Sequence, residues 1–457
     1  MPLPNYLPMP SFIQKYQWIV DPIAYMENAA QKYPDIFTGE IVSFGNTVVF
    51  VNHPKGIQEV LNNDRKKFVA AGELNKILQP LAGENSILML DGNRHKWRRQ
   101  LVMPSFHGDR LKAYGQQISN ITEKIFAQLP VNQTFLARTV FQEISLQVIL
   151  QTVFGLYEGE RFQILRHLLG LLMDVFNSAM SSSLLLFPVL QQNLGAWSPW
   201  GKFIRLRQQI DEFLYAEIAK SRKQSNPDRI DILSLLISAK DETGEQMTDA
   251  ELRDELITLL LAGHETTATS MAWALYWIHR QPEVLEKLLQ ELDAVGDSPD
   301  VTIIARLPYL TAVCNETLRM CPPVMLTFPR IVQEPVDLLG HRLETGTVVA
   351  GCIYLAHHRE DLYPEPQKFK PERFLERQFS PFEFMPFGGG VRVCIGQALA
   401  LFEMKLVLAK VLSSYQLTLG TRRPEKAGRR TISLAPARGV KMLITGIREH
   451  RKLVCQS

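Results

Sequence analysis

A glycine-rich loop that carries one cysteine, FGGGVRVCIG at residues 387–396, restricts the fold of this 457-residue chain more than any other segment. It stands directly before Gln397–Leu412, which the hydrophobic pattern predicts to be an amphipathic helix. Backbone amides at a helix N-terminus favour a thiolate, and glycines let the backbone approach a large flat ligand. No Gly-Lys-Ser/Thr of a phosphate loop follows. Cys394 is therefore a candidate ligand, the alternative being a buried structural cysteine beside a turn.

Composition narrows the class of protein. Hydrophobic residues make up 46% of the chain and charged residues 21%, as in globular proteins. With 50 Lys and Arg against 47 Asp and Glu, the net charge of +3 gives no reason to expect nucleic acid as a partner. The cysteines are too few for a disulfide scaffold and are expected to be reduced; they are Cys314, Cys321, Cys352, Cys394 and Cys455.

The N-terminus lacks the apolar stretch of a signal peptide, because four prolines fall within its first ten residues. No segment reaches the roughly 18 uninterrupted apolar residues of a membrane span. We therefore expect a protein without a transmembrane segment that is soluble or at most peripheral to a membrane.

The order of patterns predicts a fold that is mainly α with a smaller β-rich part, in a single domain over residues 1–457. A proline-rich lead-in occupies residues 1–35, with a short helix near residues 22–33. The β-rich part comprises 36–53, read as a hairpin around Gly45-Asn46, and 324–360. The helical part comprises 54–320 and 397–412. Within it, helices are predicted over 111–128, over 250–280 after a Thr248-Asp249 cap, and over 310–320.

A second constellation, AGHETT at residues 262–267, lies inside the long predicted helix. Its flanks are apolar almost all round, which indicates a buried helix. Unpaired polar groups are costly there, so a Glu and two Thr suggest a function, although a solvated surface is the alternative. Ala262 and Thr266 are four apart and share a face.

A third constellation pairs Glu316-x-x-Arg319 with PERF at residues 371–374. Glu and Arg three apart on a helix form an ordinary surface pair in most proteins. Only the order along the chain, in which both precede the cysteine loop, favours a special role.

The spacing F-x-x-G-x-R-x-C-x-G resembles the haem-binding loop of the cytochrome P-450 family. The resemblance implies that family's fold, with haem b (iron protoporphyrin IX) between the long central helix and the cysteine-loop helix. It makes Cys394 the axial iron ligand, places Phe387 near the sulfur and pairs Arg392 with a haem propionate.

The other constellations resemble the same family. AGHETT matches its oxygen-activation motif, in which Thr266 would hydrogen-bond the bound oxygen and Glu265 would gate protons from solvent. The third constellation matches its structural triad, which would be Glu316, Arg319 and Arg373. Weaker matches imply that three further residues bind the haem propionates, namely His95, Arg99 and Arg330.

The resemblance implies a haem-thiolate monooxygenase of the soluble bacterial type, close to cyanobacterial members, and a cytoplasmic monomer. At this length no flavin reductase is fused, so the expected electron donors are ferredoxin and ferredoxin reductase. Basic residues such as Lys96, Arg98 and Lys405 are candidates for steering an acidic partner, or are simply a solvated charged face. The rival readings are a haem-thiolate peroxygenase or isomerase and a non-enzymatic haem sensor.

By resemblance, substrate contacts come from stretches that are mainly apolar here, which fits a hydrophobic small molecule of fatty-acid, alkane or terpenoid type, oxidised with O2. The predicted pocket residues are Leu88, Leu259, Ala262, Met325, Leu326 and Ile432.

Overall fold

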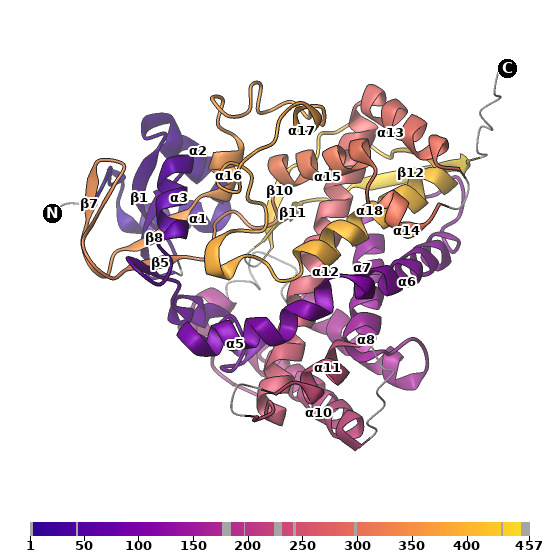
Figure 1. The fold of residues 1–457 in the computed structure, drawn as a ribbon, viewed down its shortest axis with the longest axis horizontal. Coiled ribbons are helices and arrows are strands. Elements are labelled where there is room, and N and C mark those ends of the chain that lie inside the picture. The colour runs from indigo at the N-terminus through magenta and orange to yellow at the C-terminus, as the bar shows by residue number, and fades with distance from the viewer. Residues whose placement is uncertain are drawn as a thin grey trace.

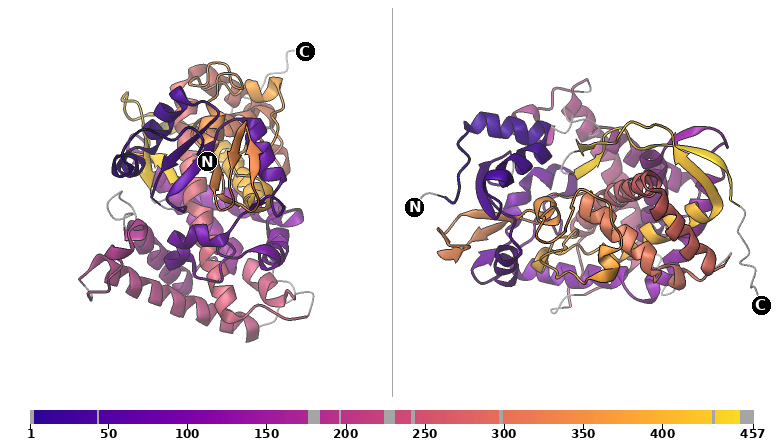
Figure 2. Two further views of the ribbon diagram at one scale, coloured as in Figure 1. Left: turned by 90° about the vertical axis from the view of Figure 1, so that its left-hand side faces the viewer. Right: turned by 90° about the horizontal axis from the view of Figure 1, so that it is seen from above.

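Helices form most of the molecule, and a five-stranded sheet lies at one end of it beside the first three helices (Figure 1). The computed structural model describes residues 3–42, 44–175, 184–195, 197–223, 231–240, 244–296, 299–430 and 433–448. In the left-hand view of Figure 2, α8 and α10 form a layer at the lower edge, away from the N-terminal elements.

The α-helices of the described residues differ widely in length, and α12 is the longest. They are α1 (Ser11–Val20), α2 (Pro22–Lys32), α3 (Pro54–Asn62), α4 (Gln79–Ala82), α5 (Gly92–Val102), α6 (Asp109–Phe126), α7 (Ala137–Phe154), α8 (Glu160–Val175), α10 (Pro199–Lys223), α11 (Ile232–Ser238), α12 (Asp249–Arg280), α13 (Pro282–Ala294), α14 (Val301–Ile304), α15 (Pro308–Met320), α16 (Ile353–His357), α17 (Arg373–Glu376) and α18 (Gln397–Ser414). Short 3-10 helices are η1 (Gly72–Leu78), η2 (Met103–Phe106), η3 (Pro188–Leu190) and η4 (Gly390–Arg392).

The strands are β1 (Ile36–Glu40), β2 (Thr47–Val51), β3 (Phe68–Val69), β4 (Thr134–Leu136), β5 (Arg330–Val332), β6 (Val336–Leu338), β7 (His341–Leu343), β8 (Val348–Gly351), β9 (Tyr415–Leu419), β10 (Ala427–Arg430), β11 (Ser433–Pro436) and β12 (Lys441–Ile447). The larger sheet has the order β1-β2-β8-β5-β3, with β2 and β8 parallel and the other pairs antiparallel. A second sheet has the order β4-β12-β9, and two hairpins pair β6 with β7 and β10 with β11.

The long helix α12 starts at a capping box. The Thr248 hydroxyl accepts from the Glu251 backbone N–H, and the Glu251 carboxylate accepts from the Thr248 N–H. Most of the helix is buried, because it packs against α7, α10, α15 and α18. It therefore forms the central support of the helical part (Figure 1).

The fold class predicted from the sequence, mainly α with a smaller β-rich part, is confirmed. The hairpin is β1–β2, and the predicted helices are α2, α6, α12, α15 and α18, with ends that differ by a few residues. The prediction missed α1 in the lead-in and all strands after residue 412. Strands β9 and β12 pair across a gap in sequence, with Met442 opposite Leu419, so no local turn signal marks them. The assignment of one domain stays a prediction.

Within the described part of the chain, no helix is long and apolar enough to cross a membrane. The largest core cluster lies among the helices, and two smaller clusters lie on the two faces of the N-terminal sheet region.

Candidate active site

The cysteine loop is held in an irregular conformation between η4 and the start of α18. The Cys394 N–H donates to the Phe387 carbonyl at 3.0 Å, which closes the loop. Gly390 has a φ of +64°, and a Cβ there would lie 2.1 Å from the Asp64 carboxylate, so this turn requires glycine. Among the four free cysteines in the described residues, the Cys394 side chain alone is exposed.

The environment of Cys394 differs from the expectation of a thiolate favoured by helix amides alone. Burial by the surrounding chain raises the pKa of its thiol, and the Gly396 N–H, Arg99 and the Gln397 N–H offset this only in part. The sulfur surface is therefore accessible, although the chain packs closely around it. A bound metal ion is what deprotonates such a thiol.

A basic cluster surrounds the cysteine loop. Arg99 on α5 donates to the Val393 carbonyl at 2.6 Å, and Arg330 donates to the Gly389 carbonyl at 3.0 Å. Burial lowers the pKa of His95 to about 3, and the charges of Arg392, Arg99, Arg65 and Arg330 lower it further. The carboxylates nearest to these arginines are Asp64, which pairs with Arg330 at 2.6 Å, and Asp91, which accepts from Arg392 at 3.1 Å. The surplus of positive charge fits a dianionic group, such as the two propionates of haem.

The middle of α12 has an accessible face although the helix is otherwise buried. Ala262 is exposed, and Leu259, Gly263 and Thr266 are partly exposed. The Thr266 hydroxyl donates to the Ala262 carbonyl at 2.9 Å, whereas Thr267 is buried and donates to the Gly263 carbonyl. An accessible run of small and apolar residues within a buried helix requires a hollow beside it. The residues present therefore fit a flat apolar group with anionic substituents, which is the shape and charge of haem.

The Glu265 carboxylate is held by two residues of α7. Arg138 donates to its Oε1 from Nη2 at 2.6 Å and from Nε at 3.2 Å. Gln142, one turn further along α7, donates to its Oε2 at 2.5 Å. The sequence analysis missed Arg138 and Gln142, because no local pattern links residues more than a hundred positions apart.

The structure brings the three triad residues together. Arg319 donates to the Glu316 carboxylate at 2.7 and 2.9 Å, and Arg373 donates to it at 3.1 Å. Glu316 and Arg319 are fully buried, and Arg319 also donates to the His357 and Pro366 carbonyls. These bonds tie α15 to the irregular chain that leads to the cysteine loop.

The predicted pocket residues lie in different surroundings. Leu88 is partly exposed, like Leu259, but Met325 and Leu326 are only 4% and 7% exposed and pack in the N-terminal core cluster. Partial exposure falls instead on their neighbours Val324 and Phe328. Ile432 lies outside the described residues.

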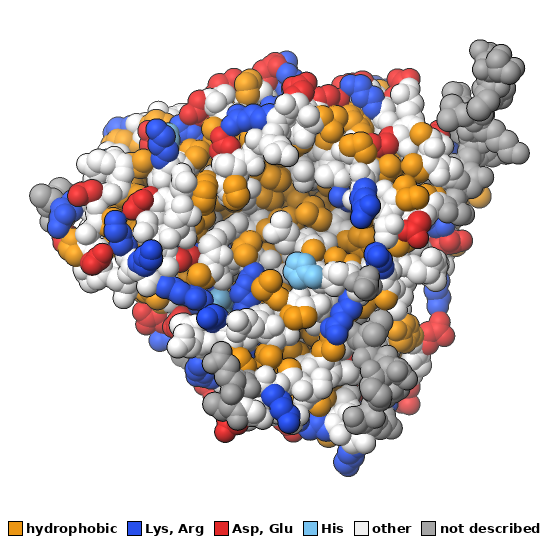
Figure 3. All heavy atoms as spheres, viewed as in Figure 1, with side chains coloured by type: hydrophobic (Ala, Val, Ile, Leu, Met, Phe, Trp, Pro, Cys, Tyr) orange, Lys and Arg blue, Asp and Glu red, His pale blue; other side chains and the backbone are white. Residues whose placement is uncertain are grey.

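A surface hollow of about 460 Å³ lies beside the cysteine loop. Its walls are mostly apolar and include Phe382, Phe384, Pro386, Phe387 and Leu401. Hydrophobic side chains gather near the middle of the face shown in Figure 3, with Lys and Arg around them.

Of the basic residues predicted to steer a partner, Lys96 is exposed and Lys405 is partly exposed. The Lys405 ammonium group donates a hydrogen bond to the Ala305 carbonyl. The prediction for Arg98 is wrong, because this side chain is fully buried and pairs with Glu251 and Glu255.

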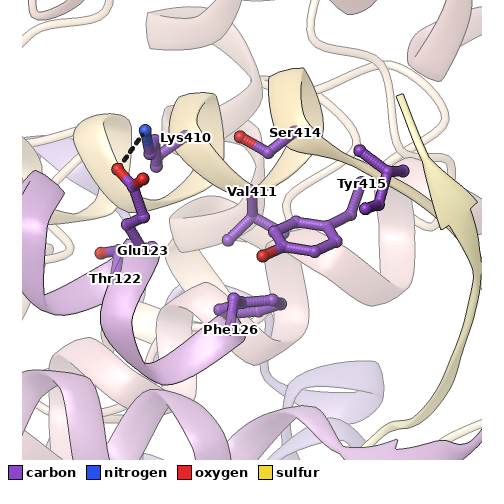
Figure 4. A pocket seen from close by; sticks show the side chains of 8 residues that line it. Thr122, Glu123, Phe126, Lys410, Val411, Ser414 and Tyr415 are labelled. Atoms are coloured by element: carbon purple, nitrogen blue, oxygen red, sulfur yellow. Dashed lines mark ion pairs between the residues drawn. The ribbon is translucent and has the colours of Figure 1, made fainter. Parts of the chain in front are cut away.

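A smaller pocket of about 130 Å³ lies between α6 and the end of α18 (Figure 4). An ion pair of 2.7 Å between Glu123 and Lys410 closes one side of it, and Tyr415 packs on Phe126. None of the predicted site residues lines this pocket.

The fold and the cysteine site together define a haem-thiolate protein, and comparisons with known proteins agree. The family model described as Cytochrome P450 matches residues 2–443. Cytochrome P450 135B1 of Mycobacterium tuberculosis is 35% identical over 432 residues, which cover 93% of this chain and 88% of that protein. Cytochrome P450 137 of the same species is 34% identical, covering 90% and 83%. The chain belongs to the cytochrome P450 family.

A solved structure has the same fold. The retinoic acid-bound cyanobacterial CYP120A1 superimposes with a TM-score of 0.85 at 23% identity, covering 98% of this chain and 99% of that one. Family membership makes the protein a haem-containing monooxygenase, an oxidoreductase that acts on a small molecule with O2 and a redox partner. The roles of individual residues are not set by family membership, and neither are the substrate and the donor.

Proposed function

We propose that the protein inserts one oxygen atom of O2 into an apolar substrate of fatty-acid, alkane or terpenoid type, with two electrons from a separate ferredoxin and its reductase. The second oxygen atom leaves as water with two protons. The observation that carries the proposal is the accessible face of α12, where Leu259 and Ala262 are apolar and Thr266 supplies one hydroxyl. Retinoic acid, named for the cyanobacterial structure, is a terpenoid acid with a largely apolar skeleton.

In this proposal Cys394 is the iron ligand, and Arg99, Arg330, Arg392 and His95 hold the propionates. Bound haem supplies the redox chemistry that activates O2. The Thr266 hydroxyl orders a water and passes a proton through its Oγ1 towards the substrate side of α12. Glu265, positioned by its ion pair with Arg138, brings that proton from solvent.

The ferredoxin is proposed to dock over the apolar hollow beside the cysteine loop. Exposed Lys96 on α5 supplies a positive charge that suits an acidic partner. The protein itself is proposed to be a cytoplasmic monomer, which size-exclusion chromatography with light scattering tests.

Peripheral contact with a membrane is supported by α1. Phe12, Tyr16 and Val20 are spaced four apart and are 73%, 66% and 59% exposed, so they form an apolar stripe on this helix. Co-sedimentation with phosphatidylglycerol vesicles tests it, and Phe12→Ser with Tyr16→Ser is expected to abolish any binding.

A peroxygenase or an isomerase-like haem enzyme needs no electron donor, and a haem sensor has no use for a proton path. The paired contacts of Arg138 and Gln142 with Glu265, next to Thr266, favour the monooxygenase.

The decisive test is spectroscopic and kinetic. Reduced protein with carbon monoxide is expected to show the long-wavelength Soret band of thiolate ligation, and Cys394→Ser is expected to lose it, while Cys314→Ser retains it. With a surrogate ferredoxin system, NADPH consumption is expected to depend on substrate. Survival of the band in Cys394→Ser, or turnover without a donor, would contradict the proposal.

A further inference from the structure

Residues 85–91, here named the 85–91 segment, are bonded on one side to α12 and on the other side to the cysteine loop. The segment runs from Asn85 to Asp91, just before α5. It includes Leu88 and Met89, which are partly exposed between the buried residues Ile87 and Leu90. Its position therefore depends on the same two elements that carry Thr266 and Cys394.

Two carboxylates of α12 accept hydrogen bonds from the segment. The Asn85 backbone N–H and its side-chain amide donate to Asp254 Oδ2 at 2.9 and 3.2 Å. The Ile87 N–H donates to Glu255 Oε2 at 3.3 Å. One turn further along α12, the Thr258 hydroxyl is hydrogen-bonded to the Ser86 hydroxyl at 2.7 Å. The backbone at Gly83 also comes so close to Asp254 that a Cβ would lie 2.1 Å from its Oδ1.

Buried arginines complete this contact. Arg98 is fully buried, and its Nη1 donates to the Asn85 carbonyl at 3.1 Å and to Glu255 at 3.3 Å. Its Nη2 donates to Glu251 at 2.8 Å. Arg253 holds the other oxygen of Asp254 at 2.7 Å. Glu255 is fully buried, and this burial raises the pKa of its carboxyl to about 7 despite the attraction of Arg98.

The opposite side of the segment is held by Arg392, two residues before Cys394. Arg392 donates to the Ile87 carbonyl at 2.9 Å and to the Leu90 carbonyl at 2.5 Å. The two polar groups of Ile87 are thus bonded to different elements, its N–H to α12 and its carbonyl to the cysteine loop.

Buried ion pairs seldom add net stability, because desolvation offsets their attraction, but they do specify one geometry. We propose that Asp254, Glu255, Thr258 and Arg98 are positioning residues that hold the 85–91 segment as a rigid wall of the substrate cavity. Leu88 and Met89 on this wall set the size of the apolar molecule that the cavity accepts. The inference rests on the proposed function, because it assigns a limit of substrate size to that site.

The test compares Asp254→Asn and Thr258→Val with Asp249→Asn, an exposed aspartate of the same helix that pairs with Arg222. All are prepared as haem-loaded protein. Hydrogen exchange of the 85–91 segment is measured, together with the dissociation constants of two iron-binding probes, imidazole and the bulkier 4-phenylimidazole, from difference spectra.

Asp254→Asn is expected to exchange about tenfold faster in the segment, the effect of weakening one charge-assisted hydrogen bond. The dissociation constant of 4-phenylimidazole is expected to change at least fivefold, and that of imidazole less than twofold. Asp249→Asn is expected to match the wild type. Thr258→Val is expected to show the same trend to a smaller extent, and Thr258→Ser to restore the wild-type values.

Unchanged exchange in both Asp254→Asn and Thr258→Val would overturn the positioning role. Faster exchange with equal effects on both probes would overturn the role in size selection. If Asp254→Asn fails to fold, Thr258→Val and its serine rescue decide the matter alone. A wild-type protein that lacks the thiolate Soret band would refute the proposed function instead. The exchange measurement would still test whether α12 positions the 85–91 segment.

Discussion

Replacing Glu403 by Gln is expected to change how the stability of the protein depends on pH. Glu403 lies on α18, nine residues after Cys394, and is 3% exposed. Its Oε1 has no hydrogen-bond partner among the described residues. Burial raises the pKa of this carboxyl from 4.5 to about 8.

Between pH 4.5 and about 8 the unfolded chain has this carboxyl ionised, while the folded protein keeps it protonated. The folded state then binds more protons, so the free energy of unfolding falls as pH rises through this range and is level above it. At about 1.36 kcal/mol per pH unit, the full range corresponds to about 5 kcal/mol. For a chain of 457 residues the unfolding entropy is about 1 kcal/mol/K, so the melting temperature changes by about 5 °C.

The assay is thermal unfolding by circular dichroism from pH 5 to pH 9 at one scan rate. Glutamine has nearly the same size and is neutral at every pH, so Glu403→Gln is expected to lose this decline and to be the more stable protein at pH 9. The matched control is Glu123→Gln, since Lys410 lowers the pKa of that exposed carboxyl (Figure 4). The reasoning would be refuted if the melting temperatures of Glu403→Gln and the wild type changed with pH in the same way across this range.

Three further predictions concern catalysis. Thr266→Ala is expected to keep its haem but to lower product formed per NADPH by about 10²-fold, with hydrogen peroxide released instead; Thr267→Ala, buried on the next face, should matter less, and equal coupling in the two variants would contradict the proton role. Arg138→Gln leaves Glu265 without its cation, so kcat is expected to fall about tenfold with a changed solvent isotope effect and an unchanged substrate dissociation constant; an unaltered isotope effect would count against a proton path through Glu265. Lys96→Glu is expected to raise the KM for ferredoxin about threefold to tenfold at low salt and to leave kcat alone, whereas Lys15→Glu on α1 should have no effect; equal KM values would remove Lys96 from the docking surface.

Residues whose contacts lie within a few positions were predictable. The capping box at Thr248 and Glu251 and the Glu316–Arg319 pair are set by helical spacing of three residues. The cysteine loop belongs to the same class, since its closing bond joins Cys394 to Phe387. These short patterns were enough for the fold class and the family.

The apolar predictions were less successful, because hydrophobic composition does not tell a cavity wall from a core. Met325 and Leu326 pack against the N-terminal cluster, and the accessible side chains are Val324 and Phe328 beside them. Which side chains of an irregular segment are buried and which are accessible depends on the elements packed on either side of it. These elements come from other parts of the chain.

By itself, then, the sequence determined the ligand loop, the central helix and the order of the motifs, because backbone geometry and local hydrogen bonds encode them within one or two turns. The tertiary structure alone decided the partner of each buried charge whose counter-charge is distant in the sequence. Arg138 reaches Glu265 across 127 positions, and Arg330 reaches Asp64 across 266. Arg98, which looks like a surface arginine in the sequence, is buried against Glu251 and Glu255. A charge can be buried only where the folded chain supplies its counter-charge, and no local pattern in the sequence specifies a partner that lies a hundred or more positions away.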